Sequence, residues 1–153
     1  MGRGRYAAIP ARSTLFGNAP RVRAWWRESM LKFEQYQDTN LLECTLDGPL
    51  IRKDYDALTA KADEMIEQFG QLRFLEVIER IGKIQPSAIW ADFKWGPKHI
   101  KSFTHVAVVA DQKWIEWMIV PFRKFMSCEV RVFHLDELED ARQWLLAAEP
   151  PQD

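Results

Sequence analysis

The sequence has few of the residues from which catalytic and metal sites are built. Its two cysteines, Cys44 and Cys128, form no CxxC pair, which argues against a disulfide framework and fits a reducing cytoplasm. The three histidines match no zinc-binding spacing. There is no GxSxG motif and no glycine-rich phosphate loop. We therefore expect no catalytic residues, no cofactor and no metal.

Long apolar runs and an excess of positive charge are also missing. No apolar run approaches the roughly 18 residues that a membrane-spanning helix needs. The formal net charge is -1, which gives a general nucleic-acid role no support. At 153 residues, the chain is long enough for one domain with a core of its own.

The charge is unevenly distributed along the chain. Residues 1–29 hold six arginines and one acid, whereas the remaining residues carry 15 Lys and Arg against 21 Asp and Glu. Residues 1–24 show no helical or strand periodicity, so we expect a disordered basic leader over 1–29 and a domain over 30–149. The leader has three readings: a tail that touches a membrane or acidic partner, a transit-like segment, or sequence upstream of a true start at Met30. We favour the third reading.

Hydrophobic periodicity in the domain alternates between period 2 and period 3.6. The expected strands are 31–36, 41–46, 72–78, 106–110 and 130–133, and the expected helices are 53–69, 86–93, 97–101, 113–125 and one from about 136. This order predicts an α/β fold with a mixed, mostly parallel five-stranded sheet, an N-terminal hairpin and about four helices.

Local signals mark the ends of these elements. Asp47-Gly48-Pro49 is expected to end the second strand, and Gly70 to end the first helix. Gly96-Pro97 is expected to interrupt a helix. Asp136 and Glu139 have the spacing of a capping box for the last helix.

Seven tryptophans are present, and several cluster in two segments, 86–101 and 113–125. Clusters of this large, amphipathic side chain form core ridges, pocket walls or membrane-facing surfaces. The 113–125 helix is apolar almost all round, and its Trp117 side has no obvious cover. It is therefore our candidate for a mobile lid or a homodimer surface.

Basic and aromatic side chains alternate between Asp92 and His105. An anionic membrane or an acidic head group would select such a surface, and the expected contacts are Lys94, Lys98 and Lys101. The alternative is a solvated loop whose aromatic rings turn inward. His99 has three readings: it holds an acidic ligand group, pairs with Asp92, or bonds a backbone carbonyl.

An ordered series of short stretches resembles the SpoIIAA-like proteins of the STAS/SEC14 type, over about residues 30–147. The matching stretches are Gly48 through Asp54-Tyr55, Trp90–Lys94 with His99, Phe103–Asp111 followed by Trp114, Arg131–Phe133 and Ala141–Leu145. The usual Thr-type cap before the Asp-Tyr pair is replaced by Ile51-Arg52-Lys53, a loss of about 1 kcal/mol.

The resemblance implies a sheet backed by helices, an apolar cavity for a small hydrophobic or lipid-like ligand, and no established enzymatic activity. The expected ligand-binding residues are Trp90, Phe93, Trp95, His99, Phe103, Trp114, Trp117 and Met118. We thus expect a bacterial, cytoplasmic, non-enzymatic binder that contacts the inner membrane peripherally. The alternative is a STAS-type regulator that acts on a protein partner through a helix surface, with Ser87 as its phosphorylation site.

Overall fold

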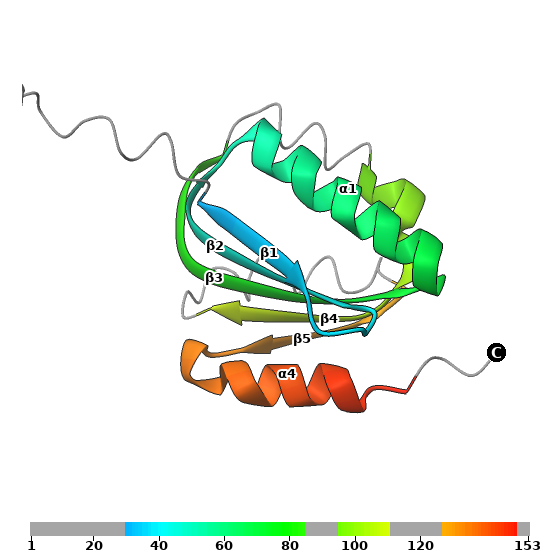
Figure 1. Cartoon of the computed structure of the whole chain (residues 1–153). Coiled ribbons are helices and arrows are strands. Elements are labelled where there is room, and N and C mark those ends of the chain that lie inside the picture. Colours follow the sequence, from blue (N-terminus) through cyan, green and yellow to red (C-terminus); the bar gives the residue numbers. More distant parts are fainter. Residues whose placement is uncertain (1–29, 85–94, 111–126, 150–153) are drawn as a thin grey trace, which may run out of the picture.

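The computed structural model describes residues 30–84, 95–110 and 127–149. Its centre is one five-stranded sheet in the order β1-β2-β3-β4-β5, so that neighbours in sequence are also neighbours in the sheet (Figure 1). The strands are β1 (Leu31–Gln35), β2 (Leu41–Leu50), β3 (Leu72–Ile84), β4 (Phe103–Ala110) and β5 (Glu129–Phe133).

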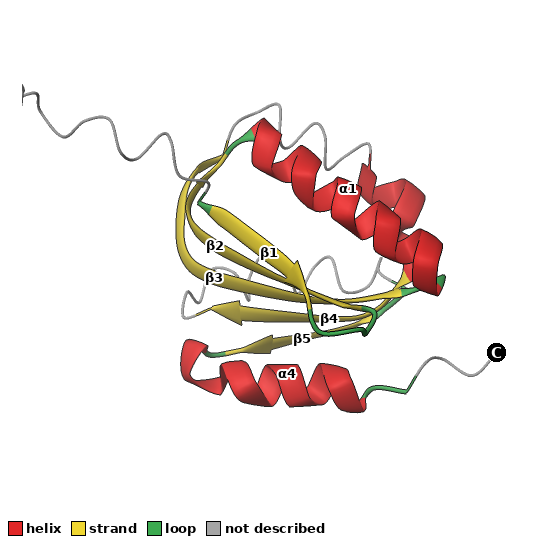
Figure 2. Ribbon diagram, in the orientation of Figure 1, coloured by secondary structure: helices red, strands yellow, loops and turns green. Residues whose placement is uncertain are grey.

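The sheet is mixed in the way the sequence predicts. β1 and β2 form an antiparallel hairpin, and β2 through β5 run parallel. The helix α1 (Arg52–Phe69) crosses one face of the sheet, and α4 (Leu138–Ala147) crosses the other (Figure 2). The predicted α/β class is confirmed, and the sheet has two distinct faces, called here the α1 side and the α4 side.

Alternation along the strands assigns the side chains to these two faces. On β2, Leu42, Cys44 and Leu46 belong to the clusters on the α1 side, whereas Leu41 belongs to the core under α4. The two sets therefore lie on opposite faces of the sheet. Because helices cover both faces of a parallel sheet, its strands need apolar residues on both faces. Strands β3 and β4 have them.

Strands β2 and β3 extend further than their apolar patterns predict. β2 continues through Asp47-Gly48-Pro49 to Leu50, so the expected break at these residues is wrong. Two irregularities in the β2–β3 pairing, at Leu46/Asp47 and at Gly48/Leu50, accommodate the turn signals within the strand. Gly48 has φ 131°, a backbone conformation that glycine adopts without strain.

Helix α1 ends as predicted and begins without a side-chain cap. Gly70 has φ 75° and donates its N–H to the carbonyl of Ile66 at 2.8 Å, which is the left-handed C-terminal cap expected of glycine. At the other end, Ile51 makes no capping hydrogen bond. Instead, the negative side chain of Asp54 in the first turn interacts favourably with the helix dipole.

The start of the last helix differs from the prediction. A 3-10 turn, η2 (Leu135–Glu137), precedes α4, and the capping box consists of His134 and Glu137. The backbone N–H of His134 donates to Oε2 of Glu137 at 2.8 Å. The box based on Asp136 and Glu139 is wrong because the first turn is 3-10, which shifts the N-cap two residues earlier.

Residues 95–99 are helical and continue into η1 (Ile100–Ser102), which leads directly into β4. The helix predicted over 97–101 is therefore confirmed, and Gly96 lies within the same helical residues; the predicted helix 86–93, which Gly96-Pro97 was expected to interrupt, lies outside the described residues. The predicted leader 1–29 and the predicted helices 86–93 and 113–125 lie outside the described residues.

Candidate ligand-binding face

The α4 side of the sheet carries a buried hydrophobic core, called here the closed core, with partly exposed side chains such as Phe133 and Trp144 around it. Its members come from β2, β3, β4 and α4, and the buried ones are Leu41, Leu75, Val77, Ala107, Val109, Ala141 and Leu145. Two arginines hold α4 on this face through hydrogen bonds. Arg73 donates from Nη1 to the carbonyl of Leu145 at 2.6 Å, and Arg142 donates from Nε to Oε1 of Glu43 at 2.6 Å. This face is therefore filled by the protein itself.

The α1 side is packed less completely. Helix α1 packs most closely at Ala62 and Met65, which are buried against Leu42 and Leu72. Three further residues of its apolar stripe remain partly exposed, namely Leu58, Ile66 and Phe69. The apolar stripe of this 18-residue helix is therefore buried only in part.

Four partly exposed aromatic residues lie between α1 and the sheet, and we call them the aromatic layer: Phe33, Phe74, Trp95 and Phe103. Phe74 and Phe103 pack edge to face with ring centroids 6.2 Å apart, and Trp95 and Phe103 do so at 5.7 Å. Phe74 contacts all three hydrophobic clusters of the α1 side. Such pairs contribute about 0.5–1.5 kcal/mol beyond their buried area.

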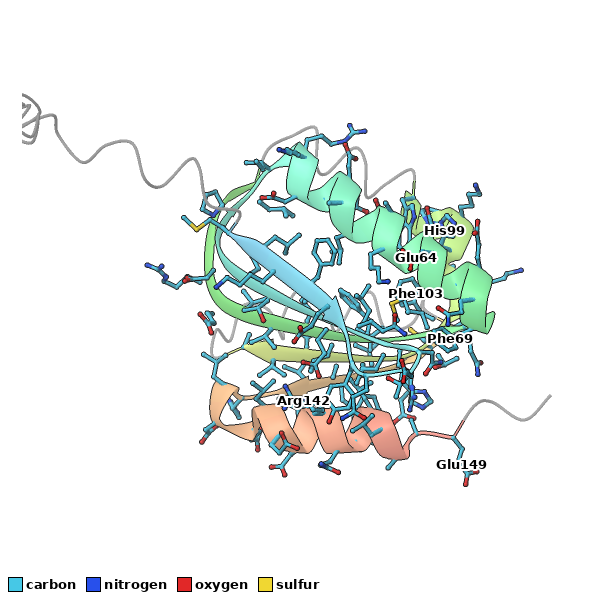
Figure 3. All side chains as sticks on the ribbon, in the orientation of Figure 1. Glu64, Phe69, His99, Phe103, Arg142 and Glu149 are labelled. Atoms are coloured by element: carbon cyan, nitrogen blue, oxygen red, sulfur yellow. The ribbon has the colours of Figure 1, made fainter. Side chains whose placement is uncertain are left out.

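Hydrogen bonds to α1 fix the orientation of Trp95. Its Nε1 donates to Oδ1 of Asp63 at 2.9 Å. The ring of His99 stacks on Trp95 with centroids 4.5 Å apart, and its Nε2 lies 3.1 Å from the same Asp63 oxygen. Figure 3 shows His99 and Phe103 close to the C-terminal half of α1. Asp63 thus joins α1 to the helical residues 95–99.

His99 is bound on both ring nitrogens within the protein. Nδ1 lies 3.0 Å from the backbone oxygen of Trp95, and Nε2 faces Asp63. Of the three readings of this histidine, the bond to a backbone carbonyl is present, and its acidic partner is Asp63. The predicted partner, Asp92, lies outside the described residues.

The other predicted site residues divide into two groups. Trp95 and Phe103 come together in the aromatic layer, and the exposed Lys98 and Lys101 follow on the same segment. Six predicted ligand or head-group contacts and the predicted phosphorylation site lie outside the described residues: Trp90, Phe93, Lys94, Trp114, Trp117, Met118 and Ser87. The membrane contact of the two exposed lysines stays a prediction.

Sequence reasoning missed the contribution of the strands to this face. Phe33 and Phe74 belong to the aromatic layer, and Glu76 lies two residues further along β3 on the same side. Neither phenylalanine is among the ligand-binding residues that the sequence predicts. The period-2 spacing of Phe74, Glu76 and Ile78 was the available signal.

The two thiols are free and differ in burial: Cys44 is buried and Cys128 is half-buried. Burial raises the pKa of the Cys44 thiol, and the negative charge of Glu76 raises it further. Burial also raises the pKa of Cys128. Both thiols therefore stay protonated at neutral pH, the form that is a poor nucleophile.

Two further features are absent from the described residues. None of the helices there is both long enough and apolar enough to cross a membrane. Likewise, no three His, Cys, Asp or Glu side chains in this part of the chain gather as metal ligands.

The strand order, the parallel crossovers and the helices on opposite faces define a three-layer α/β domain. Residues 41–146 match the family model described as SpoIIAA-like. The chain belongs to the SpoIIAA-like family, as the matching stretches predicted. A comparison with curated proteins found no match.

A solved structure supports the same assignment. It is the crystal structure of an uncharacterized protein of the DUF3478 family, with a SpoIIAA-like fold, from Shewanella loihica PV-4. The two structures superpose with a TM-score of 0.63 at 26% sequence identity, over 75% of this chain and 91% of that chain. The similarity therefore extends over nearly the whole of the other protein.

Proposed function

We propose that this protein is a non-catalytic binding domain that takes a small apolar or lipid-like ligand on the α1 side of its sheet. The observation that carries the proposal is the contrast between the two faces. The α4 side has a buried aliphatic core, with α4 held on it by Arg73 and Arg142 and with Phe133 and Trp144 partly exposed around it. The α1 side leaves both the aromatic layer and part of the α1 stripe partly exposed.

Exposed apolar surface of this kind favours a ligand. Each Å² of apolar area removed from water contributes roughly 25 cal/mol. Ligand sites in proteins are mostly apolar and aromatic, with a few placed polar groups. Phe33, Phe74 and Phe103 supply apolar area, and the Trp95 ring is held by its bond to Asp63. A ligand would therefore contact an aromatic surface in which the orientation of the Trp95 ring is already fixed.

The polar groups near this face support binding without catalysis. His99 is already bound to Trp95 and Asp63, so it is not poised as a base for a substrate. Cys44 is buried, and its raised pKa keeps the thiol protonated. We accordingly propose that the ligand leaves unchanged.

A second candidate function is a STAS-type regulator that binds a protein partner. Membership of the SpoIIAA-like family favours it. In this alternative the exposed face of α1, which carries the ion pairs Arg52–Asp56 and Lys61–Glu64, is a contact surface. Ser87 would be its switch. A phosphorylation assay on full-length protein in cell extract, with Ser87→Ala as the control, tests this candidate.

The binding proposal is tested first by native mass spectrometry of the full chain purified from cells. We expect a fraction of the protein to carry added mass that organic extraction removes. Calorimetric titration with 1-dodecanol, a neutral apolar probe, should then show saturable binding to the extracted protein. Absence of both retained mass and saturable binding would overturn the proposal.

A matched pair of variants locates the site. Phe74→Leu removes ring area from the aromatic layer and should weaken dodecanol binding by about fivefold, since about 1 kcal/mol of burial is lost. Phe133→Leu makes the same change on the α4 side, where Phe133 packs against the closed core. It should leave dodecanol binding unchanged.

A further inference from the structure

Asp54 is a charged residue on the sheet-facing side of α1. It precedes Leu58, Ala62 and Met65 by four, eight and eleven residues, a spacing that places all four on one side of a helix. Ala62 and Met65 are buried against the sheet. Asp54 is only 9% exposed, and it is the one buried polar or charged residue among those that the structure describes. Its carboxylate therefore lies at the N-terminal end of the apolar stripe.

This carboxylate has no partner in the part of the chain that the structure describes. The neighbouring Arg52 pairs with the exposed Asp56 at 2.7 Å, and no hydrogen bond or ion pair among the described residues reaches Asp54. Its oxygens are not sealed off, because Nδ1 of His105 is the one fully enclosed side-chain polar atom there that lacks a hydrogen bond. Asp54 is therefore buried, unpaired and still within reach of a small group.

An unpaired carboxylate is costly at a buried position. A charged group that leaves water loses its hydration, and a hydrogen-bond donor has to replace that hydration. The dipole of α1 offsets only part of the cost, since it acts as about half a unit charge at the helix N-terminus. A carboxylate can only accept hydrogen bonds. A ligand that brings a donor to this end of the α1 side would therefore supply what the protein leaves out.

Partly exposed apolar side chains connect Asp54 to the aromatic layer. Leu58, one helical turn after Asp54, packs against two hydrophobic clusters of the α1 side, and Phe33 and Phe74 pack against the same two. All three are partly exposed. The eleven residues from Asp54 to Met65 span about 16 Å along the helix axis. An extended dodecyl chain has about this length, so one amphiphile can contact the aromatic layer and Asp54 together.

We propose that Asp54 accepts a hydrogen bond from the hydroxyl head of a neutral long-chain amphiphile whose chain lies on the aromatic layer. This inference rests on the proposed function, which supplies the contacts of the chain. A hydroxyl brings one donor to the carboxylate, whereas an ammonium head brings three and leaves at least one of them unmet beside apolar side chains. A carboxylate or phosphate head meets repulsion from Asp54 and from the domain, in which residues 30–153 carry 15 Lys and Arg against 21 Asp and Glu.

Probes with the same chain and different heads test the proposal. 1-Dodecanol, its methyl ether and dodecylamine are titrated into the full chain by calorimetry, below the concentrations at which they aggregate. We expect the alcohol to bind about tenfold more tightly than the ether, because only the alcohol donates a hydrogen bond to the charged acceptor. Dodecylamine should bind more weakly than the alcohol. Asp54→Asn should reduce the preference for the alcohol over the ether to about threefold, since a bond to a neutral acceptor is about half as strong. Asp54→Leu should remove the preference.

Asp56→Asn is the matched control, because it makes the same change on the exposed side of α1. It should leave the preference for the alcohol unchanged. Urea unfolding of the ligand-free protein separates a ligand contact from a structural role. Asp54→Asn should leave the midpoint unchanged or raise it, since an unpaired buried charge is removed. A lower midpoint would assign the carboxylate to the helix start and overturn the inference.

Three binding results would also overturn the inference. They are an unchanged preference in Asp54→Asn, an equal loss of preference in Asp56→Asn, and tighter binding of dodecylamine than of the alcohol to the wild-type protein. The wild-type order of the probes decides alone if neither Asp54 variant folds. If the ether binds as tightly as the alcohol, the head-group inference fails and the proposed function stands; if no probe binds, the proposed function fails.

Discussion

The indole Nε1 of Trp95 donates to Oδ1 of Asp63 at 2.9 Å, and so ties the helical residues 95–99 to the middle of α1. His99 lies 3.1 Å from the same carboxylate oxygen. One side chain of α1 therefore holds two members of the segment that completes the aromatic layer. Both contacts join residues more than 30 positions apart, which local sequence patterns do not reveal.

Removal of this carboxylate should loosen the segment. We expect Asp63→Ala to lower the free energy of unfolding by about 1–2 kcal/mol, because Trp95 and His99 lose a shared hydrogen-bond acceptor. Asp56→Ala, which removes an exposed pairing with Arg52, should cost less than about 0.5 kcal/mol. Urea unfolding followed by circular dichroism measures both. Equal costs would mean that Asp63 contributes only as a surface charge.

Arg142 permits a comparison of two carboxylates on one guanidinium. Glu43 is 16% exposed and lies 2.6 Å from Arg142, whereas Glu139 is 66% exposed at the same distance. The Glu43 hydrogen bond is the main reason that the pKa of Arg142 is raised. Glu43→Gln should therefore destabilise the fold by about 2 kcal/mol, and Glu139→Gln by about 0.5 kcal/mol or less. Chemical denaturation of both variants measures these costs. A larger cost for Glu139→Gln than for Glu43→Gln would contradict the account.

Gly82 is required by the close approach of β3 to β2. A Cβ atom there would lie 2.7 Å from the backbone nitrogen of Pro49, in a part of the chain where neither backbone can shift without breaking the strand pairing. Gly82→Ala should cost about 2 kcal/mol or more. Gly96→Ala is the control, because a Cβ at Gly96 meets nothing within 4 Å. It should be neutral or slightly stabilising in a helix. A thermal shift assay on the two variants distinguishes them.

His105 should make the stability of the fold depend on pH. Burial lowers its pKa, Glu129 opposes this effect, and Arg73 and Arg131 add to it. Its Nδ1 is buried without a hydrogen-bond partner among the described residues, and its ring packs edge to face on Trp144. The unfolded chain therefore takes up a proton first as the pH falls.

The direction of the pH dependence of stability follows from this order of protonation. The stability that His105 contributes is fully present above the ordinary histidine pKa of about 6.5 and is lost as the pH falls through it. Denaturant midpoints at pH 8 and pH 5.5 should thus differ less in His105→Gln than in the wild-type protein. An unchanged difference would show that other groups produce the acid sensitivity.

The fold was predictable because its signals are local. Alternation on β2 and the 3.6-residue stripe of α1 gave the strands, the helix and the two faces, and Gly70 gave the helix end. Where a strand ended was less predictable: β2 passes through Gly48 and Pro49 because the pairing with β3 shifts register there. That tolerance depends on the neighbouring strand and not on the residues themselves.

The site was predictable only in part. Trp95 and Phe103 were recognised from the clustering of aromatic residues, and the structure brings them together. Phe33 and Phe74 were missed, since their membership of the aromatic layer depends on which face of the sheet packs against α1. The sequence shows which side chains share a face, but the cover provided by α1 is a tertiary property.

The central claim, that the α1 side binds an apolar ligand, is tested most directly by methyl-resolved NMR during titration with 1-dodecanol. We predict saturable shift changes at methyl groups near the aromatic layer, Leu58, Ile66 and Val106, together with changes in the Trp95 indole signal. Methyl groups of the closed core, Val109 and Leu145, should not respond. Shifts confined to the α4 side, or none at any saturating concentration, would contradict the account.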